Sequence, residues 1–188
     1  MTDLPRVTEI LKGFTHYDQV PKDILARAAA RGTTVHALCA GLAKGAWIPD
    51  GMIPEEYAGY VTSYKKWAEA QVKHFMIVEK RYMDEDWGFT GQLDFVVTCN
   101  DDLVYLVDLK TSAKPQKTYP VQMSAYDYLL RLNGIKVHAA LIVYLKKDGE
   151  FPDIDLIEDM SEEFNIFTCA LKCFNYFNRR KNRAGTSS

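Results

Sequence analysis

Two stretches of the sequence decide the fold: Gly91-Gln92-Leu93-Asp94-Phe95-Val96-Val97 and Val107-Asp108-Leu109-Lys110-Thr111. Both have the composition of β-strands, and the short polar turn Asn100-Asp101-Asp102 between them predicts an antiparallel hairpin. Because side chains alternate along a strand, Asp108 and Lys110 point the same way. If Asp94 lies on that side of the hairpin, two carboxylates and one ammonium meet at a single point.

Alternation also predicts which residues of the first strand share a face. One face is expected to carry Phe89, Gly91, Leu93, Phe95 and Val97, and the other Thr90, Gln92, Asp94, Val96 and Thr98. Asp108 ends an apolar run that is typical of a strand buried on both faces, so its charge lies at the rim of a core and needs compensation. A divalent metal ion is the usual compensation, and phosphodiester hydrolysis the usual purpose. A solvated surface ion pair is the alternative.

Length and composition predict one globular domain. The chain has 188 residues, of which 47% are hydrophobic and 26% charged. We expect an N-terminal helical part over 1–74, a sheet core over 75–145 and a C-terminal helix over about 162–180. The net charge is −2 and the sequence pI about 6.1, so contact with nucleic acid must use a local patch. No stretch reaches the ~20 apolar residues of a membrane span, and no signal-peptide pattern opens the chain, so we expect a cytoplasmic protein.

The pattern of elements predicts an α/β fold. Helices are expected from Pro21 to Gly45 and over 54–74, then strands over 75–82, 88–98 and 103–110. A helix over 119–132, ended by Asn133-Gly134, precedes a strand over 136–145. The helix between the third and fourth strands allows a parallel crossover. This order predicts a mixed central sheet of about four strands with helices on both faces.

The four cysteines are expected to be reduced and buried among apolar neighbours: Cys39, Cys99, Cys169 and Cys173. Cys169 and Cys173 are one helical turn apart and could ligate a metal, but no C-x-x-C pair accompanies them, so this interpretation is less favoured.

Four further residues could serve the site. His36 lies on a predicted helix, where Gly32 one turn earlier would let another backbone approach closely; a half-buried spectator is the alternative. Glu79 is expected on the side of Phe75 and Ile77, either supporting the site or pairing with Lys80 or Arg81 in solvent.

Gln122 and Tyr126 are four apart on the helix after Lys110 and share a face, where both could hydrogen-bond a phosphate or a base edge. The alternative puts Tyr126 in the core and Gln122 in solvent. Lys114 and Lys117 could touch a phosphate backbone.

In combination these residues resemble the PD-(D/E)XK nuclease superfamily, and within it the RecB-like and phage-type exonuclease branch. That branch carries Gly-x-x-x-His, Gly-x-x-Asp, Asp/Glu-x-Lys and Gln-x-x-x-Tyr in order. The chain has these motifs as Gly32 to His36, Gly91 to Asp94, Asp108-Leu109-Lys110 and Gln122 to Tyr126. Its opening Val7-Thr8-Glu9-Ile10-Leu11 also resembles phage-type members, so the likeness spans residues 7 to about 145.

The resemblance implies a restriction-endonuclease-like core and a role for each motif residue. It implies that Asp94, Asp108, the Leu109 carbonyl and a ring nitrogen of His36 bind Mg²⁺ or Mn²⁺. Lys110 would orient the attacking water, while Gln122 and Tyr126 would hold the nucleic acid. Some relatives carry an iron–sulfur cluster with three closely spaced downstream cysteines. This chain has two, so no cluster is expected.

The resemblance implies a metal-dependent deoxyribonuclease, an exonuclease that acts on single- or double-stranded DNA ends in recombination or repair of phage or bacterial DNA. Any recombination or helicase partner is expected to be a separate chain. The alternatives are a catalytically silent nucleic-acid-binding module and a structure-specific endonuclease. A sequence-specific endonuclease is less favoured, because no segment is long enough for base-reading loops. The sequence leaves open the polarity of digestion, the preference for single or double strands and the choice between DNA and RNA. It also leaves open whether the protein is a monomer or a ring that encloses DNA.

Overall fold

The computed structural model describes residues 4–15, 20–112 and 115–183, which form one sheet and the helices that cover it. In chain order the elements are α1 (Val7–Leu11), η1 (Lys12–Phe14), α2 (Lys22–Ala43), η3 (Asp50–Met52), α3 (Glu55–Gln71), β1 (Val72–Asp84), β2 (Phe89–Cys99), β3 (Val104–Lys110), α4 (Thr118–Leu132), β4 (Ala139–Tyr144), β5 (Asp153–Ile157) and α5 (Ser161–Arg183). Among the described residues, none of the helices combines the length and apolarity needed to cross a membrane.

The strands form one mixed sheet in the order β1-β2-β3-β4-β5. The first three are antiparallel neighbours, which confirms the predicted β2–β3 hairpin. β3 and β4 are parallel and joined by α4, which confirms the predicted crossover. All six side chains of β4 are buried, because helices cover both faces of the sheet at this strand. The predicted α/β architecture is therefore correct.

The sheet has five strands, whereas the sequence predicted about four. The additional strand, β5, pairs antiparallel with β4 at the edge of the sheet. Its side chains are half-buried or exposed, and Asp155 accepts a hydrogen bond from the Tyr144 hydroxyl at 2.9 Å. An edge strand of this kind has no buried face to impose hydrophobic alternation, so the usual sequence signal is absent.

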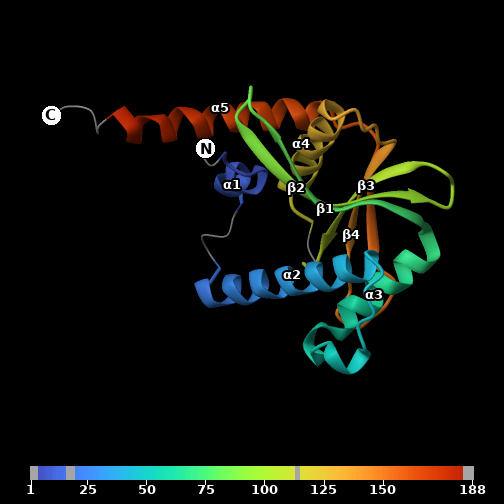
Figure 1. Cartoon of the computed structure of the whole chain (residues 1–188). Helices are drawn as coiled ribbons and strands as arrows, with labels where there is room; N and C mark the ends of the chain where they lie inside the picture. Colours follow the sequence, from blue (N-terminus) through green and yellow to red (C-terminus); the bar gives the residue numbers. More distant parts are fainter. Residues whose placement is uncertain (1–3, 16–19, 113–114, 184–188) are drawn as a thin grey trace.

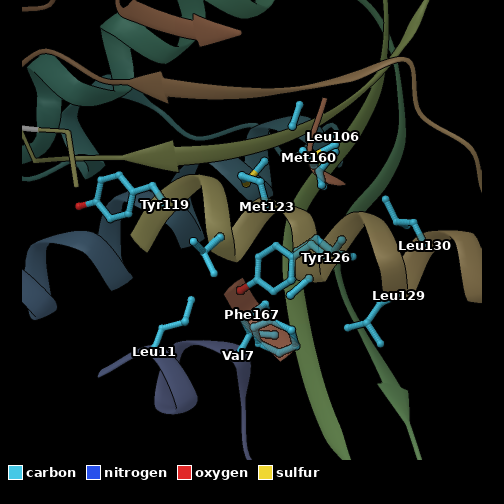
Figure 2. Packing of buried hydrophobic residues seen from close by; sticks show 14 of the residues in the cluster. Val7, Leu11, Leu106, Tyr119, Met123, Tyr126, Leu129, Leu130, Met160 and Phe167 are labelled. Atoms are coloured by element: carbon cyan, nitrogen blue, oxygen red, sulfur yellow. The ribbon is translucent and has the colours of Figure 1, made fainter. Parts of the chain in front are cut away.

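Helices cover both faces of the sheet (Figure 1), and a hydrophobic core lies on each face. On one face α1, α4 and α5 pack against the sheet, and Figure 2 shows Tyr126 and Leu129 of α4 in one cluster with Val7 of α1 and Phe167 of α5. On the other face α2 and α3 contribute buried side chains such as Val35 and Trp67. The functional residues must therefore come from both layers or from the sheet edge between them.

The expected alternation along β2 is wrong at one point. Phe89 and Leu93 pack with α4, but Phe95 and Val97 pack with α2 and α3, so the side chains change face at Asp94. The side chains of the neighbouring strand, β1, change face at the same place. Glu79 lies opposite Asp94 between two backbone pairs, Val78 with Phe95 and Lys80 with Leu93, and has a φ of 48°. For a residue with a side chain this left-handed conformation costs about 1–3 kcal/mol.

The expectation of buried cysteines holds for Cys39 and Cys99 but is wrong for Cys169 and Cys173, which are exposed. α5 buries Phe167, Ala170 and Leu171, a stripe at helical spacing. Residues 169 and 173 fall beside that stripe and face away from the core.

Candidate active site

The β2–β3 ladder ends beside Asp94. Its last backbone pair is Phe95 with Val107, and the same register continued by one residue sets Asp94 opposite Asp108. There the backbone N–H of Leu109 donates to the side chain of Asp94, at 2.8 Å from Oδ2. The Asp94 carboxylate thus takes the place of a strand carbonyl as hydrogen-bond acceptor. This in-plane position brings it to the end of the hairpin, next to the segment that carries Asp108.

His36 reaches Asp94 from the middle of α2. Its Nδ1 lies 3.0 Å from Asp94 Oδ1, and the two side chains are 27% and 17% exposed. Burial alone would lower the pKa of His36, but the charge and hydrogen bond of Asp94 outweigh it, so the pKa of the imidazole lies above its ordinary value. The close backbone approach expected at Gly32 is not found, since a Cβ there would meet only Thr111 Oγ1, at 3.9 Å.

Asp108 and Lys110 form a buried ion pair on the α4 side of the sheet. Lys110 Nζ lies 2.6 Å from Asp108 Oδ2, and their side chains are 16% and 5% exposed. At this distance the ammonium and Oδ2 form a charge-assisted contact, and withdrawing both charges from water is costly unless further groups satisfy them.

Gln122 of α4 joins the two members of this pair. Its Nε2 donates to Asp108 Oδ1 at 2.9 Å, and its Oε1 accepts from Lys110 Nζ at 3.3 Å. The residue is only 8% exposed, which excludes the alternative of a solvated Gln122. Because the amide satisfies the acid and the amine at once, it fixes the distance between them.

Tyr126 lies in the core, which was the alternative to a direct role in binding nucleic acid. Its ring is 4% exposed and its hydroxyl accepts from Gln122 Nε2 at 3.1 Å. Gly91 makes room for the ring: a Cβ on this glycine would lie 2.7 Å from Tyr126 Cε1 and 2.9 Å from Leu129 Cδ1. The motif glycine of β2 therefore allows α4 to pack close enough for Gln122 to reach Asp108.

The two carboxyl groups have opposite pKa shifts. Burial would raise the pKa of Asp94, but His36, the Leu109 N–H and Lys110 together outweigh it and hold that pKa below its usual value. For Asp108, burial and the nearby charge of Asp94 outweigh the attraction of Lys110, so the pKa of this carboxyl is raised. Neighbouring carboxyl groups whose pKa values are shifted in opposite directions are typical of catalytic pairs.

The donor set fits a hard divalent cation in its chemistry. Two carboxylates, an imidazole and the Leu109 carbonyl are the ligand types that Mg²⁺ and Mn²⁺ accept. The Leu109 carbonyl points to the Asp94 side, because Lys110 O accepts from Leu145 N at 2.8 Å and successive backbone groups of a strand alternate. As they stand, no three His, Cys, Asp or Glu residues in the described part of the chain group closely enough to hold an ion.

Tyr119 belongs to the site although sequence reasoning missed it. Lys110 Nζ lies over its ring, 4.3 Å from the centroid, in the geometry of a cation–π contact. The ring is 9% exposed. Tyr119 precedes Gln122 by three residues and Tyr126 by seven, so helical spacing put all three on one face and could have identified it.

Glu79 lies at the periphery of the site. Its Oε2 is 3.5 Å from Lys44 Nζ at the end of α2, which differs from the expected solvent pairing with Lys80 or Arg81. Phe75 and Ile77 do not share a face either, because the β1–β2 register shifts between them. The Glu79 backbone is strained where β1 passes Asp94, which makes the residue a candidate for support of the site.

Lys110 and Gln122 also face an open pocket of about 270 Å³. α1 and η1 form its other side with Thr8, Leu11 and Lys12. The Lys110 end of the ion pair is therefore accessible to a small group from solution. Lys117, half of the predicted basic pair, is exposed at the start of α4, and Lys114 lies outside the described residues.

One comparison with known proteins, a match to a family profile, agrees with the motifs. The sequence profile of the PD-(D/E)XK nuclease superfamily matches residues 9–174. Among solved structures, LHK-Exo in complex with dAMP is 16% identical with a TM-score of 0.43, over 96% of this chain and 94% of that chain. The structure of SSO0001 is 14% identical with a TM-score of 0.34, over 50% of this chain and 45% of that chain. A comparison with curated proteins found no match.

The profile match covers α2, the hairpin with both acids and Lys110, and α4 with Gln122, and so includes every element that builds the site. The chain belongs to the PD-(D/E)XK nuclease superfamily.

Proposed function

We propose that this chain is a metal-dependent deoxyribonuclease that acts as an exonuclease in recombination or repair of phage or bacterial DNA. The observation that carries the proposal is the largely buried group formed by Asp94, Asp108 and Lys110, in which the pKa values of the two acids are shifted in opposite directions. The order of the four motifs supports the exonuclease branch over other members of the superfamily.

Asp94, Asp108, the Leu109 carbonyl and a ring nitrogen of His36 would hold Mg²⁺ or Mn²⁺. When bound, such an ion lowers the pKa of a water molecule toward neutrality and stabilises charge on the phosphoryl group. The contact of His36 with Asp94 fixes the imidazole toward the same point. Glu79 would support this group from the neighbouring strand.

Lys110 would orient the attacking water and offset charge that develops on the phosphate. Burial would lower the pKa of its ammonium, but Asp108 and Asp94 outweigh it, so the pKa is raised and the group stays charged. Gln122 and Tyr119 hold the ammonium from two sides, which reduces its freedom before substrate arrives. Gln122 faces the adjacent pocket and would contact the nucleic acid there, with Tyr126 as its buried support.

The decisive experiment is digestion of end-labelled linear DNA and circular DNA, each single- and double-stranded, with Mg²⁺ or Mn²⁺. We expect progressive loss of linear substrate from its ends, resistance of circles and arrest by a chelator. Asp108→Asn should be inactive, while Asp23→Asn, on the exposed start of α2, should match the wild type and so rules out a contaminating nuclease. Cleavage of circles would indicate an endonuclease, and DNA binding without cleavage a silent module; either result contradicts the proposal.

A further inference from the structure

A groove of about 550 Å³ lies at the end of β3, whose last residue is Lys110. Thr111, the next residue, lines its floor together with Tyr144 and Leu145, and Leu145 donates to the carbonyl of Lys110. Tyr60 of α3 forms one wall, and the turn after β4 forms the other with Lys146, Lys147 and Asp148. The groove thus adjoins the end of the strand that carries Asp108 and Lys110.

The two walls are fixed against each other. A Cβ on Gly59 of α3 would lie 1.7 Å from the carbonyl oxygen of Lys147, so the helix and the turn touch through their backbones. The backbone N–H of Lys146 donates to Ser63 Oγ at 3.1 Å, one helical turn further along α3. Contacts of this kind leave little freedom to the walls, so the groove is a built feature of the fold.

Arg31 of α2 contacts two residues that line the groove, Thr111 and Tyr60, both of them neutral. Its Nε donates to Thr111 Oγ1 at 3.4 Å, and its guanidinium lies 5.7 Å from the centre of the Tyr60 ring. The residue is half-buried, yet no carboxylate in the described part of the chain lies within ion-pair distance of it. By contrast, Arg27 one turn earlier pairs with Asp23 at 2.6 Å.

A partly desolvated guanidinium without an acidic partner is a strong site for an anion. Its planar fork matches the oxygens of a phosphate, and Thr111 and Tyr60 occupy only part of its donor capacity. On the far wall, Lys146 is paired with Asp153 at 2.8 Å, and the exposed neighbours Lys147 and Asp148 carry opposite charges. The favourable place for a phosphate is therefore the Arg31 side, next to the residue that follows Lys110.

We propose that Arg31 binds the phosphate that neighbours the scissile one, and that the groove takes the nucleotide attached to it. The inference rests on the proposed nuclease function and adds the path of one nucleic-acid strand, from Lys110 past Thr111 toward Tyr60. Arg31 acts in binding and does not touch the scissile group, so its loss should raise KM more than it lowers kcat.

The test is binding of a fluorescein-labelled single-stranded DNA oligonucleotide, followed by anisotropy over a range of salt with a chelator present. Arg31→Gln should weaken binding about 10–100-fold, the range for losing a charge-assisted contact, and reduce the salt slope by about 1. Arg31→Lys should keep the slope and lose part of the affinity. Arg27→Gln, the matched control on the same helix, should change neither.

Equal affinity and salt slope for the wild type and Arg31→Gln would overturn the inference even if the wild type degrades DNA, and so would a wild type that does not bind the oligonucleotide. If binding depends on Arg31 but the protein does not cleave DNA in Mn²⁺, the result would support nucleotide binding in the groove and contradict the nuclease function. Competition by inorganic phosphate alone, as strong as that by the oligonucleotide, would show a free-anion site and overturn the strand path. Urea unfolding of each variant checks that the fold is intact.

Discussion

Replacing Gly91 by alanine tests how the sheet and α4 position the site. The new Cβ would lie 2.7 Å and 2.8 Å from two ring carbons of Tyr126 and 2.9 Å from Leu129 Cδ1. All three distances are shorter than carbon atoms tolerate, and both neighbours are buried. The change therefore cannot be absorbed by turning one side chain into solvent, and α4 must move away from β2.

The expected change in the free energy of unfolding is the sum of two opposing contributions. Overpacking of a core costs about 1–3 kcal/mol, and three contacts shortened at once place this case near the upper end. Removing a glycine from a strand returns about 0.5–1 kcal/mol of backbone entropy. The net loss should be about 2 kcal/mol, or a shift of the urea midpoint by about 1 M.

Gly32 supplies the matched control, since it is the other glycine of the site motifs. Its Cβ would lie 3.9 Å from Thr111 Oγ1, an ordinary contact, and it lies inside α2. Gly32→Ala should therefore stabilise the protein by about 0.5–1 kcal/mol through helix propensity. Equilibrium urea unfolding measures both variants. A Gly91→Ala variant as stable as the wild type, or a Gly32→Ala variant that is destabilised, would refute the packing argument.

Three further predictions concern the site itself. Lys110→Ala should lower turnover about 10²–10³-fold, the range for one preorganised donor, and wild-type rates in single-turnover DNA cleavage would reject its role. Asp108→Asn should abolish the heat of Mn²⁺ binding in calorimetry while far-UV circular dichroism stays unchanged; a full binding isotherm would remove Asp108 from the metal ligands. Tyr119→Phe should keep kcat because the ring stays under the Lys110 ammonium, whereas Tyr119→Leu should lower kcat at unchanged KM; equal losses in both variants would show that the ring is irrelevant.

The sequence was informative where the type of a residue indicated its environment in the fold. β3 was identifiable because an apolar run buried on both faces ends in Asp108-Leu109-Lys110, and strand alternation then put the acid and the amine together, as found. The spacing of Gln122 and Tyr126 likewise predicted a shared helical face. These are local rules, and they succeeded because each element kept its regular period.

Sequence reasoning failed where the regular period is broken. Alternation along β2 could not show that the strand changes face at Asp94, because the change coincides with a left-handed residue of the neighbouring strand, Glu79, that the pattern of β2 does not reveal. Nor could it show that Asp94 replaces a backbone acceptor for Leu109, which depends on where the ladder ends. Arg31 carried no sequence signal, because its significance is the lack of an acid nearby, which only the fold decides.

The break in β2 explains how two acids of opposite character arise on adjacent strands. Had β2 kept its register, Asp94 would have remained within the ladder and on one face of the sheet. By leaving the ladder it gains the Leu109 N–H and His36, which hold it ionised, while Asp108 stays in the regular strand and depends on Lys110 and Gln122. The left-handed Glu79 of β1 lies opposite the point where Asp94 leaves the ladder, so the irregular backbone accompanies the carboxyl group with the lowered pKa and not Asp108.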